Sequence, residues 1–129
     1  MIDDIKAMIE KYKFDQEEFD QEKLNFRILG LLTEEYEEIL TALENKDAEE
    51  VVDGLIDLIV IAIGTLELAS VDTQKAWDQV MVANMTKERG VKPGREESGG
   101  FDLIKPLGWE APTHVSNLGY LPSIFEDKI

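Results

Sequence analysis

Apolar residues recur at intervals of three and four positions through most of the chain up to Arg89, which is the spacing of amphipathic helices. The pattern predicts helices over Ile2–Tyr12, about Gln21–Leu43, about Ala48–Ala69 and Gln74–Lys87. No stretch alternates apolar and polar residues with a period of two, so strands are not expected. The predicted fold class is therefore all-α, an antiparallel helical bundle of about four helices.

The character of the sequence changes after Arg89. Glycine and proline punctuate residues 90–129, which predicts a long irregular C-terminal segment. Apolar and aromatic residues such as Trp109 and Tyr120 supply anchors, so we expect this tail to wrap the helices or to reach another subunit. We interpret residues 1–129 as a single domain, with a helical core over about 1–89 and a tail over about 90–129.

The third predicted helix is apolar on nearly all sides, and a helix of that kind is usually buried on all sides. A chain of 129 residues with a loose tail can hardly surround it. We therefore expect a homodimer or a tetramer, with this helix at its centre and the core completed by oligomerisation.

The overall composition excludes several function classes. The chain has 28 acidic and 13 basic residues and a formal net charge of −15, so it should repel nucleic acid. It has no cysteine, which excludes disulfides and thiolate zinc sites. The start lacks the basic and apolar regions of a signal peptide, and the most apolar run, Val51–Leu68, is too acidic to cross a membrane. We expect a cytoplasmic protein with no membrane partner.

Carboxylates interrupt the apolar faces of two predicted helices. Glu35 and Glu38 lie in the second helix, and Glu50, Asp53 and Asp57 lie in the third. A carboxylate that loses its water costs several kcal/mol unless a positive group meets it, and the third predicted helix contains no Lys or Arg. A bound divalent cation is the simplest partner.

The spacing supports one shared site. A helical projection puts Glu35 in the middle of a stripe that includes Ile28 and Ile39. The carboxylates fall in i, i+3 pairs, and the short turn at Asn45–Asp47 makes the two helices antiparallel neighbours. We therefore expect four oxygen ligands around Mg²⁺ or Mn²⁺ rather than zinc: Glu35, Glu38, Glu50 and Asp53. For most other acids, such as Glu37, a solvated helix face is the better explanation.

The segment Glu34-Glu35-Tyr36-Glu37-Glu38, followed by Glu50-Val51-Val52-Asp53, resembles the E-E-x-x-E … E-x-x-D signature of the MazG-like all-α nucleoside triphosphate pyrophosphohydrolases. The spacer between the two halves is at the short end of that family's range. Phe26-Arg27, Asp57 and Asn84-Met85-Thr86-Lys87 also resemble small phage and bacterial members. The resemblance covers about residues 1–90 and is looser in the tail.

The resemblance implies hydrolysis of a nucleoside triphosphate between its α and β phosphates. Glu35, Glu38, Glu50 and Asp53 would hold two or more Mg²⁺ (or Mn²⁺) ions, with Asp57 as an outer or additional ligand. Glu34 would orient or deprotonate the attacking water. The ions would also reconcile so acidic a protein with a polyanionic substrate.

Four further residues are candidates for phosphate binding: Asn84, Lys87, Lys92 and Arg95. Asn84 and Lys87 are one helical turn apart, although Lys87 is equally explained as a cation near a helix C-terminus. Solvated loop charge is the better explanation of the other two. For Phe26, Trp77 and Trp109, buried aromatic packing is favoured over stacking on a base.

Three functions remain open. The first is a metal-dependent pyrophosphohydrolase of deoxynucleotides, with dGTP as the first candidate. The second is a dUTPase/dCTPase-type or phosphoribosyl-ATP pyrophosphohydrolase with the same metal chemistry. The third, from another class, is a non-catalytic acidic protein that mimics nucleic acid. A mimic needs its charges outside, so Glu35 and Asp57, placed among apolar residues, argue against it.

Overall fold

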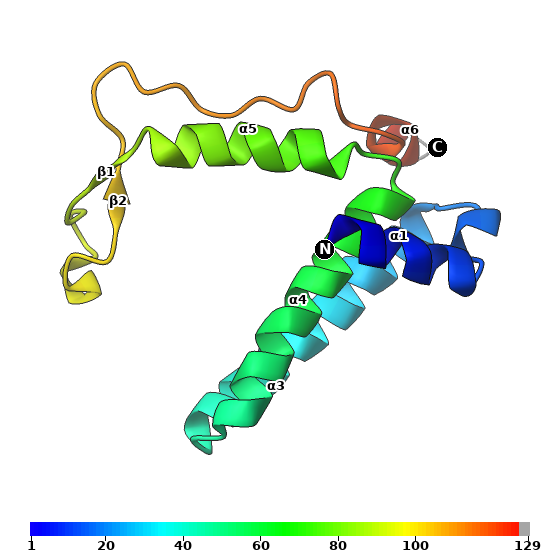
Figure 1. Cartoon of the computed structure of the whole chain (residues 1–129), viewed down its shortest axis with the longest axis horizontal. Coiled ribbons are helices and arrows are strands. Elements are labelled where there is room, and N and C mark those ends of the chain that lie inside the picture. Colours follow the sequence, from blue (N-terminus) through cyan, green and yellow to red (C-terminus); the bar gives the residue numbers. More distant parts are fainter. Residues whose placement is uncertain (127–129) are drawn as a thin grey trace. The chain divides into compact units, whose positions relative to one another are not determined.

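The computed structural model describes residues 1–126 and confirms the all-α class (Figure 1). The predicted helices are present to within two residues at each end, and the second contains three consecutive segments. The elements are α1 (Ile2–Lys11), the 3₁₀ turn η1 (Phe14–Gln16), α2 (Gln21–Asn25), the π-helical η2 (Phe26–Leu32), α3 (Thr33–Glu44), α4 (Ala48–Leu68), α5 (Thr73–Met85), β1 (Glu88–Arg89), the 3₁₀ turn η3 (Glu96–Ser98), β2 (Leu103–Ile104) and α6 (Leu121–Glu126).

The described chain divides into two compact units. The first contains Met1–Thr73 together with the residues from Leu118 onward, and the second is Gln74–Asn117. No helix within residues 1–126 is long and apolar enough to cross a membrane.

The long helix of the first unit runs without a break through α2, η2 and α3. Asp20 caps its start, because its side chain accepts a hydrogen bond of 3.0 Å from the Lys23 backbone N–H. That hydrogen bond is the main reason why the pKa of Asp20 is lowered. Phe26 and Thr33, at the two joints, both have right-handed helical backbone angles, so the π-helical stretch is a local widening rather than a kink.

Arg27 ties the π-helical stretch to α4. Its Nε donates to the Thr65 hydroxyl at 2.9 Å, and its guanidinium donates to the Ile61 carbonyl at 3.3 Å. Gly64 leaves the room for this contact, since a Cβ there would lie 2.6 Å from an Arg27 nitrogen. Burial lowers the pKa of Arg27, and the hydrogen bonds compensate part of the cost of burying its charge.

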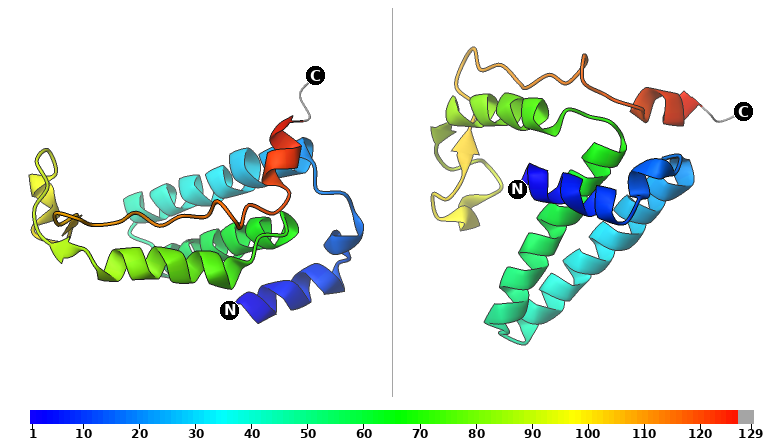
Figure 2. Two further views of the ribbon diagram at one scale, coloured as in Figure 1. Left: turned by 90° about the horizontal axis from the view of Figure 1, so that it is seen from above. Right: turned by 45° about the vertical axis from the view of Figure 1, so that its right-hand side comes forward.

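Helices α3 and α4 form an antiparallel hairpin (Figures 1 and 2). Asp47 caps α4 by accepting from the Glu50 N–H at 3.2 Å, as its position before the predicted helix suggests. The two helices approach most closely where Gly54 meets Ile39. A Cβ on Gly54 would lie 2.5 Å from the Ile39 Cγ1, so only glycine allows this spacing.

At the other end of α4, α1 packs against the helix, and α6 begins close to its last turn. Ile5 of α1 is buried, and Lys6 forms a long ion pair of 3.9 Å with Glu67. The Tyr120 N–H donates to the Ala69 carbonyl at 2.7 Å and fixes the start of α6, where Ile124 is buried. Gly119, with φ of +55°, packs so closely on Ala69 that no side chain fits there.

A large part of the apolar surface is left exposed in the single chain. Val52, Leu55, Ile56 and Ile59 form a stripe on α4 at helical spacing, and each is between 42 and 63% exposed. Phe26 is 62% exposed, so the expectation of a buried aromatic at this position is wrong for the single chain. Trp77 and Ile28 are exposed as well, against the prediction.

The second unit contains α5 and the irregular tail that returns beside it. The tail is anchored where the Trp109 indole N–H donates to the Ala83 carbonyl at 2.8 Å. The expectation that the chain has no strands is wrong in one small respect: β1 and β2 pair antiparallel, Glu88 with Ile104 and Arg89 with Leu103. A ladder two residues long is too short to leave an alternating pattern in the sequence.

We predict that Gly54→Ala destabilises the protein by about 1–2 kcal/mol, because overpacking against Ile39 outweighs the roughly 1 kcal/mol of helix propensity gained. Gly30→Ala is the matched control. Its Cβ would meet Phe26 at an ordinary 3.5 Å, so the same exchange should be neutral or stabilising. Urea unfolding of both variants tests this, and equal effects would contradict the close approach.

Candidate active site

The candidate site lies on the α3–α4 hairpin, toward its connecting turn. Glu34, Glu35 and Glu38 belong to α3, and Glu50, Asp53 and Asp57 belong to the first half of α4. The contact between Ile39 and Gly54 explains why the two sets are close, because these residues directly follow Glu38 and Asp53. Packing of uncharged atoms therefore holds like-charged side chains together.

Glu35 is partly withdrawn from water. Its side chain is half-buried, and its Oε2 is fully buried with no hydrogen-bond partner among residues 1–126. Burial raises the pKa of Glu35, and the charges of Glu38 and Asp57 raise it further. A buried carboxylate oxygen without a donor is rare in proteins, and a bound cation would satisfy it.

Glu50 is the centre of a second, overlapping group. Desolvation raises the pKa of Glu50 most, and the charges of Asp53, Asp47 and Glu38 raise it further. Glu38 acts on both Glu35 and Glu50, so it links the carboxylates of α3 to those of α4. The structure thus places all four predicted metal ligands close enough for their negative charges to repel one another.

The same side chains do not adopt a coordinating arrangement. Among residues 1–126, no three Asp, Glu, His or Cys side chains are placed so that they could hold one metal ion together. Glu38, Glu50 and Asp53 are exposed, and exposed glutamates rotate easily away from neighbours of like charge. The residues have the right chemistry for Mg²⁺, oxygen donors with an unsatisfied buried oxygen among them, and their role as ligands stays a prediction.

A hollow of about 380 Å³ opens beside this group. Glu34, Glu38 and Glu50 line it, together with Thr41 and Asn45 near the turn. Glu34, the candidate for positioning water, therefore shares the hollow with two candidate ligands. The residues that line it in the described chain include no Lys or Arg, so phosphate could enter only together with cations.

The four candidate phosphate-binding residues all lie in the second unit. Asn84 and Lys87 are half-buried, and the Lys87 N–H donates to the Asn84 carbonyl at 3.2 Å. Lys92 is half-buried, whereas Arg95 is exposed and forms an ion pair of 2.9 Å with Asp102. Their contact with phosphate stays a prediction.

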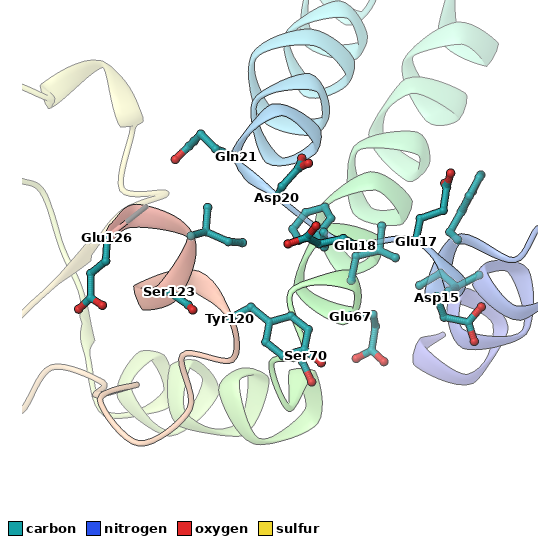
Figure 3. A pocket seen from close by; sticks show the side chains of 15 residues that line it. Asp15, Glu17, Glu18, Asp20, Gln21, Glu67, Ser70, Tyr120, Ser123 and Glu126 are labelled. Atoms are coloured by element: carbon teal, nitrogen blue, oxygen red, sulfur yellow. The ribbon is translucent and has the colours of Figure 1, made fainter. Parts of the chain in front are cut away.

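A larger cavity of about 830 Å³ lies at the opposite end of α4 (Figure 3). Six lining residues carry carboxylates and none of the lining residues in the described chain is basic: Asp15, Glu17, Glu18, Asp20, Glu67 and Glu126. Glu67 is seventeen residues from Glu50 along α4, about 25 Å of helix. This cavity therefore contains none of the predicted site residues.

Sequence reasoning missed three features that shape the site. Gly54 sets the helix spacing, Arg27 fixes the segment before the acidic motif, and η2 changes the helical pitch just upstream of Glu34. A glycine within a strongly apolar helix was the one available signal, because such a glycine often marks a close approach. No pattern in the sequence predicts the π-helical stretch.

The profile of the phosphoribosyl-ATP pyrophosphohydrolase family matches residues 1–84. The chain belongs to this family. The family is part of the MazG-like all-α pyrophosphohydrolase superfamily, so the protein is a nucleotide pyrophosphohydrolase, a hydrolase acting on acid anhydrides. The matched residues include all six carboxylates of the candidate site and Asn84. No curated protein and no solved structure gave a significant match.

We predict that Glu35→Gln changes how stability depends on pH in EDTA. The pKa of Glu35 is raised above its ordinary 4.5, so the folded protein holds this proton more tightly than the unfolded chain does. Wild-type stability should therefore fall relative to Glu35→Gln as the pH rises from about 4.5, until Glu35 is ionised in both states.

Urea unfolding at a series of pH values measures the difference between the two proteins. Glu44→Gln, at an exposed position on the same helix, is the matched control. A difference that stays constant over this range, or the same trend in the control, would contradict the burial of Glu35.

Proposed function

We propose that the protein is a divalent-metal-dependent nucleoside triphosphate pyrophosphohydrolase. It would convert a (d)NTP and water to the (d)NMP and diphosphate by attack at the bond between the α and β phosphates. The observation that carries this proposal is the buried oxygen of Glu35, which has no hydrogen-bond partner within residues 1–126. It lies in a group of carboxylates whose charges raise the pKa of Glu35 and of Glu50.

Four side chains would hold the cations: Glu35, Glu38, Glu50 and Asp53. Two or more Mg²⁺ or Mn²⁺ ions would neutralise the phosphates and make water a better nucleophile. Asp57, which adds to the charge around Glu35, would act as an outer or additional ligand.

Glu34 would act as the general base. It lies beside Glu35 in the sequence and lines the hollow that Glu38 and Glu50 also line. We propose that its carboxylate accepts a hydrogen bond from the attacking water and then takes the proton as the new P–O bond forms. The diphosphate leaves as the bond between the α phosphorus and the bridging oxygen breaks.

The substrate is proposed on two grounds. Deoxynucleotides, with dGTP as the first candidate, follow from the resemblance to small phage-type proteins. Phosphoribosyl-ATP is the second candidate, favoured by the family whose profile matches. Pyrophosphate release from a panel of NTPs, dNTPs and phosphoribosyl-ATP separates the two, and release from none of them at any divalent metal concentration would refute the proposal.

We predict that Glu38→Gln and Asp53→Asn each lower the rate of pyrophosphate release by at least about 100-fold, since even residues behind metal ligands usually contribute 10–100-fold. Glu44→Gln is the control on the same helix and should keep the activity. Far-UV circular dichroism checks that the variants fold. Full activity in either site variant would remove that residue from the site.

We further propose that two copies cover each other's exposed stripe on α4, giving a homodimer or a dimer of dimers. The stripe of Val52, Leu55, Ile56 and Ile59 is continuous, and soluble monomers rarely expose apolar surface of this kind.

We predict that Ile56→Arg dissociates the assembly, because a buried unpaired charge would cost several kcal/mol in each copy. Leu107→Arg, in the fully exposed part of the tail, is the control. Light scattering coupled to size exclusion reads out the mass. A monomeric wild type would exclude the proposed interface.

A further inference from the structure

Two lysines from distant parts of the second unit lie over the same aromatic ring, that of Trp109. The antiparallel ladder pairs Glu88 with Ile104 and Arg89 with Leu103, so Lys87 and Lys105 are the residues that flank one end of it. Their convergence on one ring creates a local concentration of positive charge in a chain with a net charge of −15.

Both ammonium groups make cation–π contacts with Trp109. The Lys87 Nζ lies 5.2 Å and the Lys105 Nζ lies 5.1 Å from the centroid of the Trp109 ring. The two charges are therefore within about 10 Å of each other. The indole itself is fixed, because its N–H donates to the Ala83 carbonyl and its own backbone closes a turn onto Pro106. One rigid ring thus positions two cations.

In the part of the chain that the structure describes, neither lysine has a carboxylate partner. Although acids outnumber bases by 28 to 13, no Asp or Glu oxygen in residues 1–126 lies within ion-pair distance of either Nζ. The nearby arginines differ, because Arg95 is paired with Asp102 and Arg89 donates to the Gly100 carbonyl. Lys87 and Lys105 are the bases of this unit that converge and stay available for an anion.

We propose that Lys87 and Lys105, positioned by Trp109, form a binding site for a chain of two or three phosphates. Lys105, to which the sequence pattern assigns no role, is then a further phosphate-binding residue. Two point charges no more than about 10 Å apart match an extended diphosphate or triphosphate better than a single small anion, which could not reach both. The proposal rests on the proposed function for its natural ligand, a nucleoside triphosphate or its diphosphate product.

The test uses inorganic pyrophosphate in EDTA, so that only side chains of the protein can hold it. Trp77→Phe leaves Trp109 as the single tryptophan, and its fluorescence reports binding, with titration calorimetry as a second readout. Lys87→Met and Lys105→Met are compared in this background. Lys11→Met is the matched control, since Lys11 also lies over an aromatic ring, 5.5 Å from that of Tyr12, but without a second lysine.

We expect Lys87→Met and Lys105→Met each to weaken pyrophosphate binding roughly tenfold, Lys11→Met to leave it unchanged, and Lys105→Arg to restore most of it. Unaltered binding in Lys105→Met, or no binding by the parent, would overturn the site. Equal affinity for sulfate at the same ionic strength would overturn the assignment to a phosphate chain.

The outcome is separable from that of the proposed function. A protein that binds pyrophosphate through Lys105 but hydrolyses no nucleotide keeps this site and loses the proposed reaction. A protein that hydrolyses nucleotides with the same KM in Lys105→Met keeps the reaction and loses this site.

Discussion

The structure depends on one close approach, that of α3 and α4 where Gly54 meets Ile39. Apolar packing at this point places carboxylates from both helices near each other although they repel. The helix pair therefore carries an electrostatic cost that its uncharged atoms compensate. That cost is a common property of active sites, where a strained arrangement in the free protein is relieved when the ligand arrives.

The helices and the acidic group could be predicted from sequence because both leave local signals. Apolar periodicity gave the helix boundaries, and carboxylates within an apolar stripe indicated a site. Phe26, Trp77 and Ile28 were expected inside and are exposed, since periodicity shows that a face needs cover but not which chain covers it. For Ile28 the helical projection also assumed α-helical pitch across residues that are π-helical.

The remaining features depend on contacts between distant residues, which no local pattern records. Arg27 meets Thr65 across thirty-eight positions, and Trp109 meets Ala83 across twenty-six. Lys87 and Lys105 converge on the ring of Trp109, at the end of a ladder only two residues long. Basic residues in the tail were visible in the sequence, but their convergence was not.

The π-helical stretch has a consequence for how this chain can vary. Such a stretch accommodates more residues per turn than an α-helix, so one residue can be lost while the segment relaxes to ordinary α-helix and the acidic motif keeps nearly the same direction about the helix axis. A return to α-helical pitch without such a loss would instead turn the motif around the axis. The pitch and the length of this segment together thus set the direction in which Glu35 faces.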